Sequence, residues 1–553
     1  MNNKFKNIIL KGVLAAFLVF SFGACETTEL EILDSPNALT SNTADVDLFI
    51  NNIQVQTAYF FEGQANINGM SEWGMEVTRI LHMFGPTYDN AYTPALLDSP
   101  WSIAYADILA DIRAMQPLAE EAGLYTHNGI AMILEAYVIA TLVDYLGDIP
   151  YSQAIQGTEF PNPVADDGAS IYAALITLLD NAIIELDRDE LSKPGTDLYF
   201  DGSESKWIKL ANTLKLKLYL QTRLVDSSVG AKIDALIADD NLMSSNADDF
   251  QFKYSAVDSG PDSRHGVFAE NFNVAADVND YMSNSYIVAL KDEKSTPDPR
   301  LRYYFYRQSL NFTTDVNEND CITLDPPDHY PSGEVFCDPG NGYWGRDHAD
   351  NDGIPPDGGL RTAWGLYPIG GKFDDSSGAA IPGRDIGIKG AGISPLLLNS
   401  YLNFMLAESA LTLGTTGDAR TYLEEGVRAS IDKVMNFAPE VVDASFEPSS
   451  DDVDDYVDDV LALYDAAGSD DEKLEVIVKE YWIALFGNGV EAYNTYRRTG
   501  KPGNLQPGLL AASGEFVNSF LYPSELVDQN SSVSQKANQG VRVFWAVGGP
   551  TVD

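Results

Sequence analysis

The chain has 553 residues, of which 45% are hydrophobic, so it can bury a large core and is not disordered as a whole. Its 35 basic and 82 acidic residues give a net charge of −47 at pH 7. This charge argues against nucleic acid and anionic membrane surfaces as partners, because both would repel the chain. A highly solvated surface, or one that attracts calcium, agrees with the acidity.

The first 25 residues have the pattern of a secretory signal. Lys4, Lys6 and Lys11 precede an apolar run at 13–20, and Ser21-Phe22-Gly23-Ala24 leads to Cys25. The run is shorter than the roughly 20 apolar residues of a bilayer span. We interpret 1–24 as a lipoprotein signal peptide and Cys25 as its acylated first residue; a cleaved signal with an unrelated cysteine is the alternative. We expect no later stretch to cross a bilayer.

After a polar, acidic tether at 25–36, apolar residues recur at helical spacing. The stretches are 105–118, 130–145, 175–186, 207–218 and 233–237, followed by 396–413, 420–435 and 472–486. We expect Asn128 to cap the second helix and Ser170 to open the third. Consecutive helices of this kind pack in pairs, as in tetratricopeptide-like solenoids. The run Asp451–Asp455 is expected to be a solvated acidic face or a helix start.

Residues from about 247 to 394 differ from the rest, because they are rich in Gly, Pro, Asp and aromatic side chains and lack helical periodicity. Loops and short strands are expected there. The predicted fold is therefore mainly α. It is a single body over 37–553, with a helical scaffold at 37–246 and 395–510 and an irregular insert at 247–394.

Only three cysteines occur, and two of them, Cys321 and Cys337, lie close together in the insert. In an exported protein, such a pair favours a disulfide. Closing a loop of this size would stabilise the fold by about 3 kcal/mol in the chain-entropy model.

Several segments, in order along the chain, resemble the SusD/RagB family of lipoproteins. They are 142–154 (LVDYLGDIPYSQA), 209–218 (KLANTLKLKL), 297–300 (PDPR), 480–487 (EYWIALFG), 491–493 with 497–500, and 522–530. We expect most of these residues to be structural: Gly147 and Pro150 to end a helix, Asp298 and Arg300 to lock a turn, and Arg497 and Arg498 to pair with buried carboxylates.

The resemblance implies a surface-exposed outer-membrane lipoprotein with a scaffold of tetratricopeptide-like helical pairs. It implies a non-catalytic lid that captures oligosaccharides, or peptides in some members, and passes them to a TonB-dependent transporter. A helical adaptor that binds only proteins is the alternative from another class.

Sugars stack their apolar faces on aromatic rings, while polar side chains bind the hydroxyls. Family members place ligand contacts in early loops, where this chain has Trp73, Arg79, Tyr88, Asn90 and Tyr92. A second candidate group is Trp344 and Trp364 in the insert. Packing in the core is the alternative for each ring, and it is the preferred interpretation for Trp101.

A calcium site is a further possibility in the insert. Asp350, Asp352 and Gly353 follow the spacing of positions 3, 5 and 6 of an EF-hand loop, but His348 and Gly359 at positions 1 and 12 do not fit. The stretch is therefore not an EF-hand, and the alternative to calcium is a plain acidic loop. The chain has no HExxH motif, nucleophile elbow, phosphate-binding loop or dinucleotide fingerprint, so we expect no enzymatic activity and no other cofactor.

Overall fold

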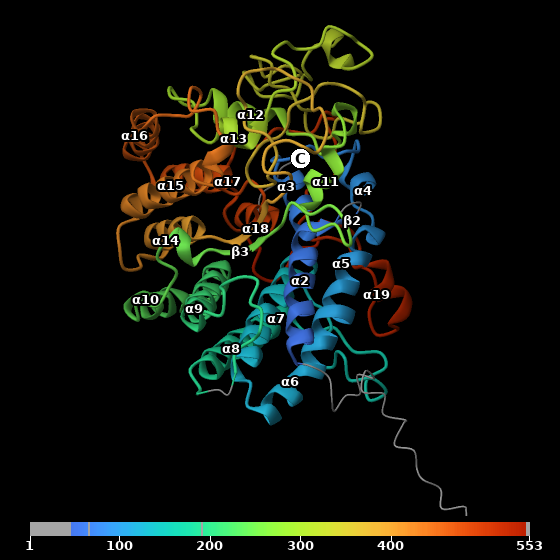
Figure 1. Ribbon diagram of the computed structural model, residues 1–553, viewed down its shortest axis with the longest axis vertical. Helices are drawn as coiled ribbons and strands as arrows, with labels where there is room; N and C mark the ends of the chain where they lie inside the picture. The colour runs from blue at the N-terminus through green and yellow to red at the C-terminus, as the bar shows by residue number, and fades with distance from the viewer. Residues whose placement is uncertain (1–45, 65–66, 190–191, 549–553) are drawn as a thin grey trace, which may run out of the picture. The chain divides into compact units, whose positions relative to one another are not determined.

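Long helices form the framework of the computed structural model, which describes residues 46–64, 67–189 and 192–548 (Figure 1). The helices before the insert are α2 (Val46–Glu62), α3 (Met70–Val77), α4 (Tyr88–Ala91), α5 (Asp98–Ser102), α6 (Ala110–Ala122), α7 (Tyr125–Leu146), α8 (Gly168–Leu186), α9 (Glu204–Gln221) and α10 (Val229–Ala238). A π-helical turn over Ile103–Leu109 joins α5 to α6. The signal peptide and the tether, with Cys25, lie outside the described residues.

The insert contains only short elements. Its helices are α11 (Gly266–Asn271), α12 (Asn284–Lys291) and α13 (Leu301–Tyr304), and the helices after it are α14 (Asn399–Leu413), α15 (Ala419–Met435), α16 (Ser450–Ala466), α17 (Asp470–Ala484), α18 (Gly489–Thr499) and α19 (Ser524–Gln529). Turns of 3-10 helix cover Pro94–Leu97, Asn246–Asp248, Ala275–Asp277, Asp320–Thr323 and Pro439–Val441. The predicted mainly α fold with an irregular insert is confirmed.

Three antiparallel pairs of short strands accompany the helices. They are β1 (Gly63–Gln64) with β2 (Ile67–Asn68), β3 (Phe250–Lys253) with β6 (Ile393–Leu397), and β4 (Phe305–Tyr306) with β5 (Ala363–Trp364). The β3–β6 pair joins the two ends of the insert, since Phe250 lies opposite Leu397 and Lys253 opposite Ile393. The insert therefore leaves the scaffold and returns to it at one place.

Successive helices pack side by side, as the periodicity predicted: α7 on α8, α8 on α9, α9 on α10, and α14 to α17 in a second group. Helix α7 is buried along nearly its whole length, because it is apolar on every side. By length and composition α7 and α8 could each cross a membrane, which corrects the expectation that no later stretch could. Both instead pack as helices of this scaffold.

Helix starts differ from the sequence prediction in two places. Helix α7 begins at Tyr125, so Asn128 lies inside it and does not cap it. Helix α8 begins at Gly168, where the Asp167 carboxylate accepts hydrogen bonds from the backbone N–H groups of Ala169 and Ser170. A capping side chain can lie before the apolar stripe begins, and periodicity alone does not locate it.

The acidic run at 451–455 is the start of a helix, as expected, with a capping box between Ser449 and Asp452. The C-terminal residues 541–545 form no strand but dock on the body. There the buried Trp545 donates from Nε1 to Asp144 at 3.0 Å.

Buried ion pairs connect the two helical groups. Glu408 of α14 accepts from Arg223, which follows α9, and from Arg498 of α18, each at 2.8 Å. Because these guanidinium groups stabilise the carboxylate, the pKa of Glu408 is lowered to about 2 despite its burial. The predicted roles of Asp298, Arg300 and Arg498 are confirmed, whereas Arg497 bonds the Asn518 carbonyl and lies over aromatic rings, so its predicted carboxylate partner is wrong.

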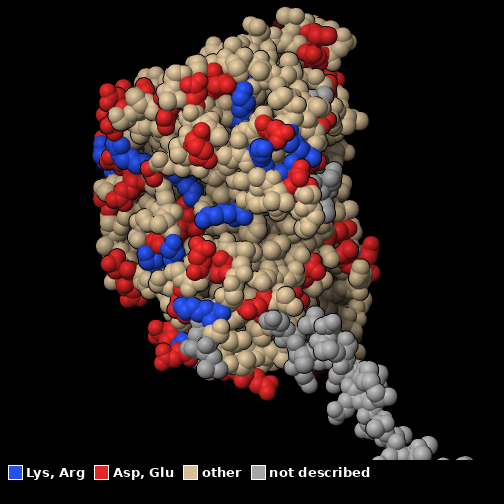
Figure 2. All heavy atoms as spheres, viewed as in Figure 1, with Lys and Arg blue, Asp and Glu red and all other residues tan. Residues whose placement is uncertain are grey.

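The acidic excess lies on the outside of the molecule. Figure 2 shows Asp and Glu side chains spread over one face, with Lys and Arg side chains interspersed among them. Single surface ion pairs of this kind contribute little to stability, so the core and the buried pairs hold the fold.

A close backbone contact joins α3, in the first part of the described chain, to α18, in its last part. A Cβ added to Gly489 of α18 would lie 1.8 Å from the Ser71 carbonyl oxygen, and one added to Gly74 of α3 would lie 2.1 Å from the Gly489 carbonyl oxygen. The Gly489 N–H donates to Ser71 Oγ at 3.1 Å, and Trp482 Nε1 donates to the Thr78 carbonyl at 2.9 Å. Only glycine allows the two backbones this close approach.

We expect Gly489→Ala to destabilise the protein by roughly 1–3 kcal/mol or to prevent folding, because the added methyl group overlaps the α3 backbone. Gly230→Ala on α10 is the matched control, since its Cβ would meet only ordinary contacts at 3.7 Å or more. In a helix, that substitution is expected to raise stability slightly. Calorimetric melting measures both, and equal melting temperatures for the two variants would contradict the close-contact argument.

Candidate functional site

A pocket of about 300 Å³ lies between the segment that follows α3 and the insert. Its wall from the N-terminal part carries Asn68, Glu72, Glu76, Leu81, His82 and Phe84, and its wall from the insert carries Glu270, Asn279, Asp280, Ile354 and Pro355. Glu72 and Glu76 are one helical turn apart on α3, so both side chains reach the same wall. No Lys or Arg is among the lining residues.

Two backbone pairings hold the walls together. Leu81 forms an antiparallel bridge with Met282, and the His82 N–H donates to the Tyr281 carbonyl at 2.9 Å. Ser283 in turn bridges to Arg346 deeper in the insert. Three segments that are far apart in sequence therefore meet at the pocket.

Phe84 carries the most exposed aromatic ring among the described residues, with 40% of its surface accessible. The ring lies edge-on to His82, with 6.5 Å between ring centroids, and it lines the pocket. All other described Phe, Tyr and Trp side chains are buried or partly buried. The most open ring of the described chain therefore lies at this pocket.

Burial and mutual repulsion perturb the carboxyl groups of the pocket. Burial and the nearby Asp280 raise the pKa of Glu76 to about 8, although Tyr92 opposes the shift, and burial and Glu270 raise the pKa of Asp280 to about 7. Burial and the surrounding carboxylates also raise the pKa of Glu72 well above its usual value. With a pKa of about 8, Glu76 is mostly protonated at neutral pH, so it can donate as well as accept a hydrogen bond.

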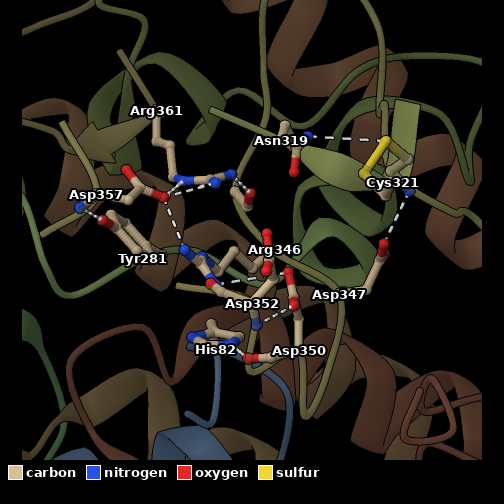
Figure 3. Close-up of polar contacts among 12 residues, drawn as sticks. His82, Tyr281, Asn319, Cys321, Arg346, Asp347, Asp350, Asp352, Asp357 and Arg361 are labelled. Atoms are coloured by element: carbon tan, nitrogen blue, oxygen red, sulfur yellow. Dashed lines mark hydrogen bonds and ion pairs between the residues drawn. A yellow bond between two sulfur atoms is a disulfide. The ribbon is translucent and has the colours of Figure 1, made fainter. Parts of the chain in front are cut away.

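A clamp of two arginines on one aspartate holds the loop that carries Ile354 and Pro355 (Figure 3). Arg346 and Arg361 both direct their guanidinium groups at Asp357, at 2.7 and 2.6 Å. Both also lie over the Tyr281 ring, about 5 Å from its centroid. These charges lower the pKa of Asp357 to about 2 although burial opposes the shift, so the carboxylate stays ionised and the clamp stays closed.

His82 fixes the other end of the same loop. Its Nε2 lies 2.7 Å from the Asp350 carbonyl oxygen and so donates to it. Burial and the neighbouring Arg346 lower the pKa of His82 to about 3, so the ring is neutral at physiological pH. The loop at 350–357 is thus held at both ends, while Ile354 at its tip is 77% exposed.

The early residues predicted to bind ligand are not open to solvent, with one exception. The rings of Trp73, Tyr88 and Tyr92 are buried and pack on Phe516 and Phe520, and Arg79 is buried with its guanidinium bonded to Gln506 and Tyr88. A ring in the core offers no face to a sugar, so the structure does not support their predicted role. Asn90 is exposed but does not line the pocket, and its role stays a prediction.

The second predicted group is buried as well. Trp344 packs edge-on to Phe312 under Arg361, and Trp364 lies 4.5 Å from the Phe486 ring centroid. Trp101 is buried and stacked on Tyr105, which agrees with its preferred core interpretation. The large aromatic residues of this chain therefore build the core.

The early residues predicted to bind ligand lie in the same segment as Phe84 but do not include it. Trp73 lies with Met70 and Val77 at helical spacing, which is typical of a core face, whereas Phe84 directly precedes Gly85-Pro86 outside any helix. The end of the helical periodicity before Phe84 was the feature of the sequence that could have indicated its exposure. Nothing in the sequence near Phe84 indicated that it would line the same pocket as Asp280 and Ile354.

The structure gives no support to the calcium hypothesis. Asp350 accepts from the Asp352 N–H at 2.9 Å, and its other oxygen lies 3.6 Å from Arg346. Among the described residues, no three His, Cys, Asp or Glu side chains form a group that could hold a metal ion.

The predicted disulfide between Cys321 and Cys337 is confirmed, with Cα atoms 5.7 Å apart. It lies beside the clamp (Figure 3), where the Cys337 N–H donates to Asp347 at 2.8 Å. The bridge therefore ties down the part of the insert that supports the pocket.

Comparison with known families places this helical fold in a class of outer-membrane proteins. Residues 36–321, just over half of the chain, match the family model described as "Starch-binding associating with outer membrane". Residues 393–543 match the one described as "Susd and RagB outer membrane lipoprotein". The chain therefore belongs to the SusD/RagB family.

Solved structures share the fold over nearly the whole chain. A "chitin-binding protein" has 21% identity and a TM-score of 0.65, covering 91% of this chain and 99% of its own. A SusD homolog from Bacteroides fragilis has 20% identity, a TM-score of 0.65 and the same coverage. A SusD/RagB family protein from Bacteroides thetaiotaomicron has 17% identity and a TM-score of 0.65, covering 92% of this chain and 100% of its own. No curated protein matches the chain.

The raised pKa of Glu76 makes stability depend on pH in a defined direction. A carboxyl whose pKa is higher in the folded protein than in the unfolded chain stabilises the fold most below its unfolded value. This contribution is lost as the pH rises from the pKa of Glu76 in the unfolded chain, about 4.5, through its pKa in the folded protein, about 8. We expect the melting temperature of Glu76→Gln to fall less between pH 5 and pH 8 than that of the wild type, because glutamine cannot ionise.

The matched control is Glu425→Gln, which removes an exposed carboxylate from α15. It should leave the slope of melting temperature against pH unchanged. A slope for Glu76→Gln that equals the wild-type slope would show that Glu76 is ionised throughout this range.

Proposed function

We propose that this protein captures oligosaccharides at the pocket beside Phe84 and delivers them to a partner TonB-dependent transporter in the outer membrane, acting as a lid without catalysis. Membership of the SusD/RagB family supports a binding role. A glycan is supported as the ligand because one of the proteins with the same fold is a chitin-binding protein.

The observation that carries the proposal is the placement of Phe84. An accessible ring stands at the rim of a pocket whose other walls are largely carboxyl and amide groups. A sugar presents an apolar face and a set of hydroxyl groups, and this lining offers a partner for each. The protonated Glu76 carboxyl adds a hydrogen-bond donor in a pocket that no Lys or Arg lines.

We expect Phe84→Ala to weaken oligosaccharide binding about tenfold, because a stacked ring contributes on the order of 1 kcal/mol beyond the area it buries. Isothermal calorimetry of the purified chain with chitin and starch oligosaccharides measures this. The ligand should be recovered intact afterwards.

Leu463→Ala is the matched control, since Leu463 is also exposed and lies in a different hollow between α16 and α17. It should bind like the wild type. Equal affinities for Phe84→Ala and the wild type would contradict the site. If the protein bound peptides and no oligosaccharide, its ligand would be a peptide, which is the alternative that the family resemblance left open.

The lipid anchor is part of the same proposal. We expect Cys25→Ser to lose metabolic labelling with palmitate and to leave the membrane fraction, because acyl chains on this residue would be the membrane attachment. Affinity purification of the tagged wild-type protein from detergent-solubilised outer membranes should recover a TonB-dependent transporter. Membrane retention of the unlabelled Cys25→Ser protein would contradict the anchor.

A further inference from the structure

A second cavity, of about 360 Å³, lies where the β3–β6 pair meets the C-terminal end of α15. It shares no lining residue with the pocket beside Phe84. The lining residues that matter here are Gln251, Lys253 and Tyr254 on the strand side, and Lys433, Asn436 and Phe437 on the helix side.

The framework of this cavity is fixed by internal hydrogen bonds. Lys433 donates from Nζ to the buried Asp249 carboxylate and to Gln251 Oε1, each at 2.7 Å. The bond from Lys433 to Gln251 Oε1 orients the side-chain amide of Gln251. Its Nε2 makes no hydrogen bond within the described part of the chain. Asn436 donates from Nδ2 to Asp432 at 2.8 Å, which leaves its Oδ1 available as an acceptor.

Two aromatic rings, together with Ile388, Ala391 and Ile393, form the apolar part of the wall. Tyr254 is buried, and its hydroxyl lies 2.9 Å from Ser394 Oγ. The ring of Phe437 is partly exposed and packs edge-on to Tyr367, with 5.3 Å between ring centroids. The cavity therefore combines an apolar surface with amide groups that have unused hydrogen-bonding capacity.

Lys253, the last residue of β3, is exposed at this cavity and has no partner among the described residues. Every other described Lys and Arg has a hydrogen bond, an ion pair or a ring contact, including those without an ion pair, such as Lys206, Arg384 and Lys473. With 82 acidic residues against 35 basic ones, an unpaired lysine is unexpected. Its charge is available to a ligand.

We propose that this cavity is a second saccharide site, and that it takes a uronate, a sugar whose ring carries a carboxylate. The sugar carboxylate would face Lys253 Nζ, ring hydroxyls would bond Gln251 Nε2 and Asn436 Oδ1, and an apolar ring face would lie on Phe437. A charge-assisted hydrogen bond of this kind is stronger than a neutral one.

The net charge of the protein does not prevent such binding. In physiological salt, interactions between exposed charges are largely screened beyond about 8 Å, so the charges within the cavity decide the outcome. Lys253 and Lys433 face one exposed carboxylate there, that of Asp432, since Asp249 is already paired with Lys433.

The test is calorimetric titration of the full purified chain with trigalacturonate and with a neutral galactose trisaccharide. We expect trigalacturonate to bind more tightly than the neutral sugar to the wild type. Lys253→Gln should raise its Kd about tenfold and remove most of its salt dependence, as expected for one lost charge-assisted contact. Because Lys253 has no partner among the described residues, the variant should melt like the wild type.

Two controls separate this site from the first. Lys473→Gln removes a lysine that lines neither cavity and should bind trigalacturonate like the wild type. Lys253→Gln should leave the binding of chitin and starch oligosaccharides at the pocket beside Phe84 unchanged, because Lys253 does not line that pocket, so a failure of either site leaves the other measurable. No binding of trigalacturonate, or the same Kd for Lys253→Gln and the wild type, would overturn the proposal.

Discussion

The contact between α3 and α18 is the constraint on which the site depends. These helices lie more than 400 residues apart in sequence, and two glycines let their backbones touch without intervening side chains. Two hydrogen bonds hold α3 in this position, one from Gly489 of α18 to Ser71 and one from Trp482 of α17 to Thr78. Because the contact is backbone to backbone, it leaves little freedom in where α3 ends and where the segment after it emerges.

That segment sets the position of everything else in the pocket. From the end of α3 the chain passes Leu81 and His82, which pair with Met282 and Tyr281, and the same stretch of the insert pairs onward with Arg346. The arginine clamp on Asp357 then fixes the loop that closes the far wall. A rigid scaffold thus places a wall made of loops, which by themselves would have no defined position.

Acidic and aromatic side chains occupy opposite locations in this protein, the former mainly on the surface and the latter mainly in the core. Acidic side chains are spread over the face shown in Figure 2, whereas several arginines are buried, with two of them sharing one carboxylate in the clamp and again at Glu408. Nearly all aromatic rings are in the core, including the tryptophans of the insert. Both sites that we propose therefore combine polar groups with one accessible or partly accessible ring, Phe84 in the first and Phe437 in the second.

The mainly helical scaffold, the presence of an irregular insert and the pairing of Cys321 with Cys337 could all be predicted from the sequence, because periodicity, composition and spacing are local properties. The sequence also predicted ligand contacts in the segment around residues 73–92. Only the tertiary structure decided which side chains there face solvent: Trp73, Tyr88 and Tyr92 turn inward and Phe84 turns outward. The physical reason is that burial depends on contacts with distant segments, such as Phe516 and Phe520, which no local pattern records.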